Sequence, residues 1–133
     1  MRDVVIVDSV RTGLTKAFRG SFNLTRSDDL LAHCIDSLLD RNPQLGPDEV
    51  EDVYVGAASH TGEQDGNLAR LAVVLSKLPI TTAGVTINRF CSSGLQSIAI
   101  AATQIAESRP RFMIMSDSTS KPISLTPQEH TQR

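Results

Sequence analysis

Strand-like and helix-like segments alternate along the first 106 residues, and this alternation limits the possible folds more than any other feature. Short runs rich in β-branched residues predict strands, and apolar residues at helical spacing predict helices. In chain order the predicted elements are 4–7, 28–41, 53–58, 68–78, 84–87 and 92–106, beginning with a strand. Strands connected through helices form a mostly parallel sheet with βαβ crossovers, so the predicted fold class is α/β.

The positions of apolar residues within each predicted strand and helix indicate which of its side chains are buried. Val4–Val7 and Gly84–Ile87 are continuous apolar runs, as expected for buried strands of a parallel sheet. Thr25–Asp28 has the form of a capping box at the start of the first helix, whose apolar stripe includes Cys34. Cys34 is therefore predicted to pack in the core. The predicted inward stripes of the later helices are Leu68, Leu71, Ala72, Leu75 and Leu78, then Leu95, Ile98, Ala102 and Ile105.

Length, charge and cysteine content exclude several classes of protein. A chain of 133 residues indicates one domain, and a net charge of −2 without a basic stripe argues against a nucleic-acid partner. No apolar stretch approaches the roughly 20 residues of a membrane span, and the N-terminus lacks signal-peptide features. Two cysteines far apart suggest neither a disulfide scaffold nor a metal site, so a reducing cytoplasm is expected.

Cys91 lies where the predicted strand 84–87 gives way to the predicted helix 92–106. Unpaired N–H groups and the helix dipole favour negative charge at such a position, which favours the reactive thiolate form. Ser92, Ser93 and Gly94 are small, so a bulky substrate is expected to reach the sulfur. The alternative reading is an inert buried cysteine, since free cysteine is among the most buried residue types.

The segment Asn88–Ser97 (NRFCSSGLQS) resembles the nucleophilic-cysteine motif of the thiolases, the thiolase-fold acyl-CoA acyltransferases. Val4–Gly20 and Gly62–Leu78 also resemble segments of that family, and the resemblance runs from about Arg2 to Ala106. It implies that the chain forms the first part of a thiolase N-terminal domain. It also implies that Cys91 is the catalytic nucleophile and a backbone donor to an oxyanion hole.

The resemblance further implies thiolytic cleavage of a 3-ketoacyl-CoA, or condensation of acetyl-CoA, through an acyl thioester on Cys91. The RTGLTKAFRGSF loop favours the degradative type, and hence fatty acid β-oxidation. Coenzyme A and acyl-CoA are then substrates, and no cofactor or metal is expected. A homodimer or larger oligomer is expected, because the family uses the region of the second helix in its dimer interface.

Three cations in one loop, and a histidine in another, can each be interpreted as functional or as structural. Arg11, Lys16 and Arg19 give one loop a positive character, which suits the phosphates of coenzyme A or marks ordinary solvated charge. His60 follows the second strand, at the edge of the sheet where Cys91 is also expected. It is a candidate base for Cys91, although a role in the loop or in a subunit contact is preferred.

The resemblance weakens after Ala106, so the predicted organisation is a partial thiolase N-terminal domain at 1–106 and a divergent tail at 107–133. Phe112–Met115 suits a fourth strand, and Lys121–Arg133 is expected to be extended or disordered. Thiolases are much longer, and their Gly-His-Pro histidine and Cys-x-Gly cysteine have no counterpart among these 133 residues. Impaired or absent activity is therefore expected of this chain alone.

Two alternatives to an enzyme remain open on the sequence. One is a non-catalytic α/β fragment that associates with itself or with a full-length partner through exposed apolar surface. The other is a small flavodoxin-like nucleotide-binding domain. The second is disfavoured because neither G-x-G-x-x-G nor G-x-x-x-x-G-K-[ST] occurs in the sequence.

Overall fold

The computed structural model describes residues 3–16, 18–107, 112–117 and 123–127. Strands and helices alternate through the first 107 residues, as the sequence predicts, and two further strands follow. The elements are β1 (Val4–Ser9), α1 (Ser27–Arg41), η1 (Pro47–Glu49), β2 (Val50–Gly56), η2 (Gly62–Gln64), α2 (Leu68–Leu75), β3 (Ala83–Ile87), α3 (Ser93–Glu107), β4 (Phe112–Asp117) and β5 (Ile123–Pro127).

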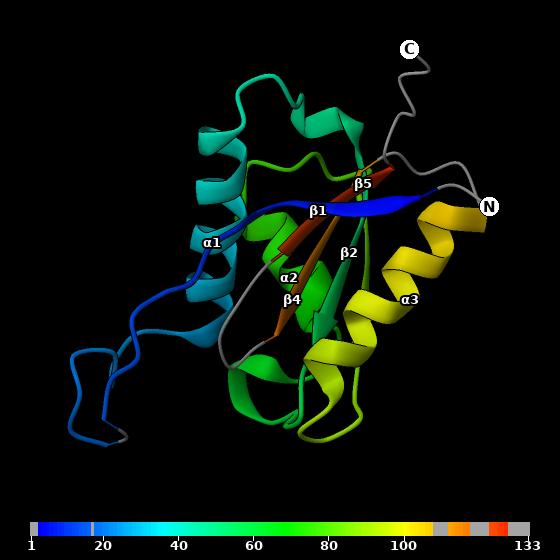
Figure 1. Ribbon diagram of the computed structural model, residues 1–133. Helices are drawn as coiled ribbons and strands as arrows, with labels where there is room; N and C mark the ends of the chain where they lie inside the picture. Colours follow the sequence, from blue (N-terminus) through cyan, green and yellow to red (C-terminus); the bar gives the residue numbers. More distant parts are fainter. Residues whose placement is uncertain (1–2, 17, 108–111, 118–122, 128–133) are drawn as a thin grey trace, which may run out of the picture.

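The strands form one sheet in the order β1-β5-β4-β2-β3 (Figure 1). β2 lies at the centre of a parallel unit, paired with β3 on one side and with β4 on the other. The helices α2 and α3 make the crossovers from β2 to β3 and from β3 to β4. The predicted α/β class with a mostly parallel sheet is therefore confirmed.

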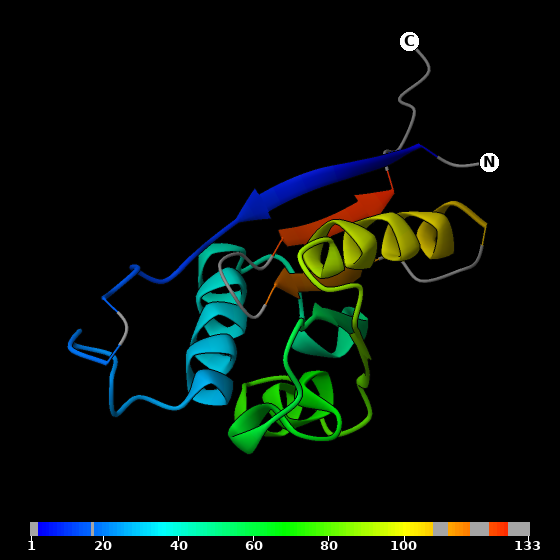
Figure 2. The ribbon, with the colours of Figure 1, turned by 90° about the horizontal axis from the view of Figure 1, so that it is seen from below.

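The sheet separates two apolar layers. Helices α1 and α2 cover one face and α3 covers the other (Figures 1 and 2). Because side chains alternate along a strand, β2 contributes to both layers. Val53 and Val55 pack with α1 and α2, whereas Tyr54 packs with Ala101 and Ile105 of α3. Both layers hold β2 in place, and its carboxyl end supports the candidate site.

The prediction that the first and third strands are buried is wrong. Among the described residues β3 pairs only with β2, so it is an edge strand of the sheet, and Val85 is exposed. β1 lies at the opposite edge and pairs with the antiparallel strand β5. Ile6 and Val7 are more than half exposed, because the helices pack over β2, β3 and β4 and hardly reach β1. Apolar runs predict strands here, but they do not predict how many neighbours each strand has.

Helix α1 follows its predicted pattern closely. Cys34 is buried with Leu31, Ile35 and the leucines one turn further on, so its predicted packing role is confirmed. The prediction of a capping box is wrong, since the N-cap residue is Arg26 and no side chain forms a capping hydrogen bond. Instead, the Arg26 guanidinium donates to both carboxylate oxygens of buried Asp28, at 2.8 and 3.0 Å. Arg26 thus neutralises a carboxylate buried in the first turn.

The inward faces of α2 and α3 differ from the predicted ones. In α2 the buried residues are Leu68, Ala69, Ala72 and Val73, whereas Leu71 and Leu75 are exposed. In α3 they are Ser93, Gly94, Ser97, Ala101 and Ile105, whereas Leu95 is 72% exposed. Small residues therefore face the sheet in both helices, together with Leu68, Val73 and Ile105. Leu71, Leu75 and Leu95 point outward, so the buried faces differ in part from the predicted stripes.

The segment after α3 adds two strands to the sheet. β4 pairs parallel with β2, and β5 lies antiparallel between β4 and β1. Of the range 121–133, for which an extended or disordered state was expected, residues 123–127 form β5 and the others lie outside the described residues. The division of the chain at residue 106 stays a prediction.

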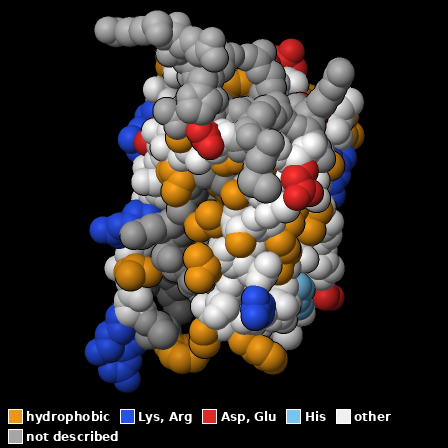
Figure 3. Space-filling view, turned by 45° about the vertical axis from the view of Figure 1, so that its right-hand side comes forward, with side chains coloured by type: hydrophobic (Ala, Val, Ile, Leu, Met, Phe, Trp, Pro, Cys, Tyr) orange, Lys and Arg blue, Asp and Glu red, His pale blue; other side chains and the backbone are white. Residues whose placement is uncertain are grey.

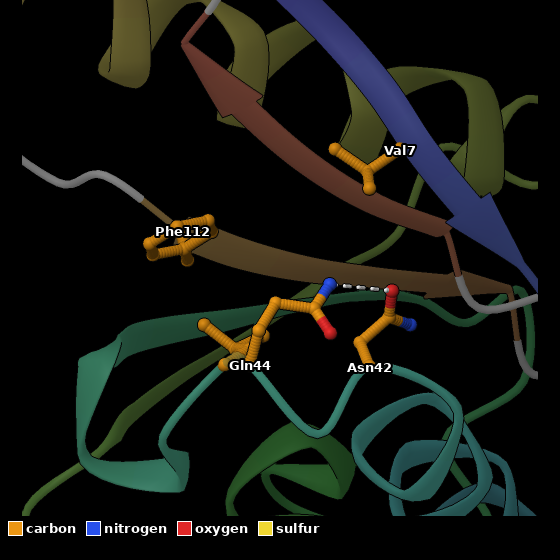
Figure 4. A pocket seen from close by; sticks show the side chains of 5 residues that line it. Val7, Asn42, Gln44 and Phe112 are labelled. Atoms are coloured by element: carbon orange, nitrogen blue, oxygen red, sulfur yellow. Dashed lines mark hydrogen bonds between the residues drawn. The ribbon is translucent and has the colours of Figure 1, made fainter.

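A small pocket lies between β1, β4 and the turn after α1 (Figure 4). Val7, Leu45 and Phe112 line it together with Asn42 and Gln44, whose side-chain amides are 3.5 Å apart. Its volume is about 60 Å³. Ligand sites for drug-sized molecules usually measure roughly 300 Å³ or more. The pocket is therefore too small to hold an acyl-CoA.

The Arg26–Asp28 pair predicts a pH-dependent contribution to stability. Hydrogen bonding to Arg26 lowers the pKa of Asp28 below its usual value, outweighing the opposite effect of burial. The stabilisation is therefore present above the unfolded-state pKa of about 4 and is lost as pH falls through the folded-state pKa. Urea unfolding should show Asp28→Asn less stable than the parent at pH 7, with the difference shrinking toward pH 3.

The neighbouring exposed carboxylate provides the control. Asp29 lies in the same first turn, and Asp29→Asn leaves the Arg26 pair intact. We expect this variant to stay close to the parent at both pH values. An equal loss in Asp28→Asn at pH 7 and pH 3 would contradict the ionic origin of the effect.

Candidate active site

Two segments meet at the carboxyl edge of the parallel strands. Gly56 is the last residue of β2 and pairs with Ile87, the last residue of β3. The segments that follow β2 and β3 remain in contact, because the Ala57 N–H donates to the Ile87 carbonyl at 2.9 Å. Asn88 Nδ2 then lies 3.5 Å from the Ala58 carbonyl oxygen. The loop after β2 and the loop that carries Cys91 therefore lie side by side, as the sequence predicts.

Cys91 lies in a tight turn between β3 and α3. The Ser92 N–H donates to the Arg89 carbonyl and the Ser93 N–H to the Phe90 carbonyl, both at 3.1 Å. Phe90 has φ of 48°, in the left-handed region that side chains other than glycine rarely adopt. The Asn88 side-chain oxygen accepts from the Phe90 N–H at 2.9 Å. The chain thus reverses within a few residues and enters α3 at Ser93.

The first turn of α3 packs directly on the end of β2. A Cβ atom placed on Gly56 would lie 2.4 Å from the Ser93 carbonyl carbon and 2.5 Å from the Gly94 nitrogen. Only a glycine permits this approach. Ser93 and Gly94 are both buried, so they do not line the approach to the sulfur, which corrects the expectation from their small size. Gly56 fixes where the helix begins, and hence where Cys91 lies.

The two cysteines occupy opposite environments. Cys91 is free and exposed, two residues before α3 begins. Cys34 is free and buried, and its burial raises the pKa of its thiol above the ordinary value. The inert buried state, the alternative reading for Cys91, is therefore found at Cys34 instead. A reagent or substrate in solution can reach Cys91 without any opening of the core.

An open groove runs from this turn along the outer side of α3. Arg89, Ser92, Leu95, Gln96 and Ala99 line it. The Arg89 guanidinium donates to the side-chain oxygen of Gln96, which holds the cation against the helix. The groove combines one cation with apolar side chains close to Cys91 in the sequence.

His60 has a different partner from the one considered for it. Its Nε2 atom lies 3.0 Å from the Ala57 carbonyl oxygen, within its own loop. No hydrogen bond joins His60 to Cys91 in the part of the chain that the structure describes. The contact with Ala57 favours the alternative reading of His60, as a residue that holds the loop after β2.

The loop between β1 and α1 carries the other predicted group. Its cations Arg11, Lys16 and Arg19 are all exposed, and so are the apolar side chains Leu14 and Phe18. The segment extends away from the sheet and helices in both ribbon views (Figures 1 and 2). The attraction of these cations to phosphates stays a prediction.

The described part of the chain holds neither a metal-binding cluster nor a membrane-spanning helix. Among residues 3–16, 18–107, 112–117 and 123–127, no cluster of three His, Cys, Asp or Glu side chains is arranged to hold a metal ion. In those same ranges, none of the helices has the length and apolar character needed to cross a membrane.

Three residues have a structural role at this site that was not predicted from the sequence. They are Gly56, Asn88 and Ser93, which set the position and conformation of the turn rather than its chemistry. A glycine that ends an apolar strand was the available signal for Gly56, since it often marks close backbone approach. The hydrogen bonds of Asn88 and Ser93 depend on tertiary geometry and leave no comparable signal.

The fold and this turn together define an α/β domain that presents an accessible cysteine beside a helix N-terminus. Residues 4–116 match the family model described as the N-terminal domain of thiolase. The chain belongs to the thiolase family, as its cysteine motif indicates.

Named relatives agree with this assignment. The chain is 45% identical over 105 residues to a 3-ketoacyl-CoA thiolase of Vibrio vulnificus, and 44% identical to one of Aeromonas salmonicida. Each match covers 79% of this chain and 27% of the relative. This chain thus spans about a quarter of the length of the curated relatives it matches.

Proposed function

We propose that this chain carries the nucleophile of a thiolase-type acyl-CoA acyltransferase, and that Cys91 forms the acyl thioester. The observation that carries the proposal is the position of Cys91, which is free, exposed and next to the N-terminus of α3. Family membership adds independent support. A thiolate is the reactive form of cysteine, and a helix N-terminus stabilises negative charge.

The names of the relatives suggest a 3-ketoacyl-CoA as the substrate. In the proposed reaction the Cys91 thiolate attacks the 3-keto carbonyl, and the bond between C2 and C3 breaks. The electron pair leaves on C2, which takes a proton to give acetyl-CoA, while the shortened acyl group stays on Cys91. The thiolate of coenzyme A then takes the acyl group and releases Cys91. Covalent catalysis divides a difficult reaction into two easier steps.

Cys91 needs partners to react at a useful rate. A base must lie within hydrogen-bonding distance, and an oxyanion donor is worth about 3 kcal/mol. His60 Nε2 lies against the Ala57 carbonyl, and the 133 residues contain no Gly-His-Pro segment. We therefore propose that these residues complete the reaction only with groups supplied by another polypeptide segment. No further cofactor or metal enters this chemistry.

Thiolysis assays test this requirement. The purified 133-residue chain, given a short 3-ketoacyl-CoA and coenzyme A, should show no acetyl-CoA formation above that of the Cys91→Ser variant. The physical reason is that catalytic groups act as a unit, so an isolated nucleophile retains little rate. Turnover that depends on Cys91 in the isolated chain would show that its own residues suffice.

A second copy of the chain is the proposed partner for the β3 edge. An edge strand leaves one row of N–H and C=O groups unpaired. Exposed apolar side chains flank it on α2, in the following turn and on β3 itself, and patches of this kind mark association surfaces. They are Leu71, Val74, Leu75, Ile80 and Val85. This surface also supports the non-catalytic alternative, in which the chain associates with itself or with a full-length relative.

Analytical ultracentrifugation tests the dimer. The parent should sediment as a dimer, and Val74→Glu should sediment as a monomer, because a buried unpaired carboxylate opposes association. Leu14→Glu is the matched control, since Leu14 is also exposed but lies in the loop after β1. A monomeric parent, or equal effects of both substitutions, would contradict a dimer through this surface.

The two free cysteines support a cytoplasmic location as part of the proposal. A reducing compartment keeps thiols in the reduced state that the thioester chemistry requires.

The exposed groove along α3 is relevant to the substrate. Figure 3 shows hydrophobic side chains spread over the face that carries α3, with few charged ones between them. Such a surface suits an apolar acyl chain or another protein surface.

A further inference from the structure

We propose that Ser93 is a positioning residue for Cys91, acting through a hydroxyl group that closes the turn from Arg89 to Ser93. This role rests on the proposed function of Cys91, but it is tested on the thiol itself and not on thiolysis. Failure of the acyltransferase proposal would therefore leave the test intact. Ser93 touches neither substrate nor sulfur in this role, and acts only through the turn.

The hydroxyl of Ser93 makes two hydrogen bonds to the backbone of the turn. Its oxygen accepts from the Arg89 N–H at 2.8 Å, and its O–H donates to the Phe90 carbonyl at 2.6 Å. Both partners precede Cys91, whereas Ser93 follows it. One side chain thus connects the chain before the cysteine to the helix after it.

Burial makes this connection difficult to replace. Ser93 is 2% exposed, so water has little access to take over its bonds. Without the hydroxyl, the Arg89 N–H loses this part-buried hydrogen bond, and the turn loses the contact that joins it to the start of α3. Phe90 already has a rarely adopted backbone conformation with φ of 48°. The hydroxyl bond to its carbonyl helps to hold that conformation, so its loss lets the turn relax.

The opposite side of Ser93 is fixed by β2. The Cα atom of Gly56 packs against the backbone of Ser93 and Gly94, so the helix start has no room to move toward the sheet. The turn is the part that can adjust. When it relaxes, Cys91 moves relative to the first-turn N–H groups of α3, which weakens the interaction of these donors with the sulfur.

Ser97 provides a matched control on the same helix. It is also buried, and its hydroxyl donates to the carbonyl three residues earlier, Gly94, at 2.7 Å. Ser93→Ala and Ser97→Ala therefore remove the same group from the same buried stripe of α3. They differ in that Ser93 is hydrogen-bonded to the turn that contains Cys91.

The test is the rate of iodoacetamide alkylation of each cysteine in the 133-residue chain, read by peptide mass spectrometry from pH 6 to 9. Near neutral pH, Ser93→Ala should slow Cys91 alkylation about three- to fivefold, the scale of a helix-terminus effect, and alter the pH dependence of this rate. Ser97→Ala should leave both unchanged. Protection of Cys34 in each variant reports that the core is folded. An unchanged Cys91 profile in folded Ser93→Ala, or the same change in Ser97→Ala, overturns the proposal.

Amide hydrogen exchange of the unmodified chain provides a second measurement that does not depend on the variant folding. The Arg89 N–H, held by buried Ser93, should exchange much more slowly than an unprotected amide in a solvent-exposed loop. Exchange of Arg89 at the rate of an unprotected amide would overturn the proposal.

Discussion

Gly56→Ala is expected to unfold the protein or to reduce its stability severely. The added Cβ would lie 2.4 to 2.6 Å from three backbone atoms of Ser93 and Gly94. Backbone at this position cannot turn aside as a flexible side chain can, so α3 must move away from β2. Overpacking of this kind costs roughly 3 kcal/mol, a large part of a typical domain stability of about 5–15 kcal/mol.

Thermal and urea unfolding followed by circular dichroism measure this effect. Gly13→Ala is the matched control, because a Cβ at Gly13 meets nothing within 4 Å. Its stability should stay within about 0.5 kcal/mol of the parent, as for most surface substitutions. If Gly56→Ala and Gly13→Ala unfold at the same denaturant concentration, the close packing of α3 on β2 is not a feature of the protein.

The class of fold followed from the sequence because local patterns specify it well. The apolar stripe of α1 is accurate at Cys34, Ile35 and Leu38, where one face of the helix is apolar and the other is polar. Helix α2 has leucine or valine on several sides, so periodicity alone does not identify its buried face. Its small residues face the sheet because they allow the helix to approach closely.

The order of the strands in the sheet could not be predicted from the sequence. β1 and β3 are edge strands despite apolar sequences, and β5 lies between β1 and β4. These arrangements depend on pairing between segments far apart in the chain. The same holds at the candidate site, where the sequence indicates Cys91 and its helix. The contacts of Ser93 with Arg89, and of Gly56 with the start of α3, arise only when the elements pack together.

The accessible position of Cys91 has a direct chemical consequence. Cys91 is exposed beside a helix N-terminus, whereas Cys34 is 4% exposed within α1. Burial also raises the pKa of the Cys34 thiol, which reduces its reactive thiolate further. Alkylation of Cys34 requires the core to open, and an opening free energy of about 3 kcal/mol corresponds to a rate difference of about 100-fold.

Competitive alkylation of the two thiols near neutral pH is therefore the measurement that tests the central claim most directly. The folded chain, treated with limiting iodoacetamide and read by peptide mass spectrometry, should carry the label at Cys91 about 100-fold more rapidly than at Cys34. In urea the two rates should become similar, which provides the unfolded control. Equal rates without denaturant would contradict the claim that this fold protects Cys34 and presents Cys91 as an accessible nucleophile.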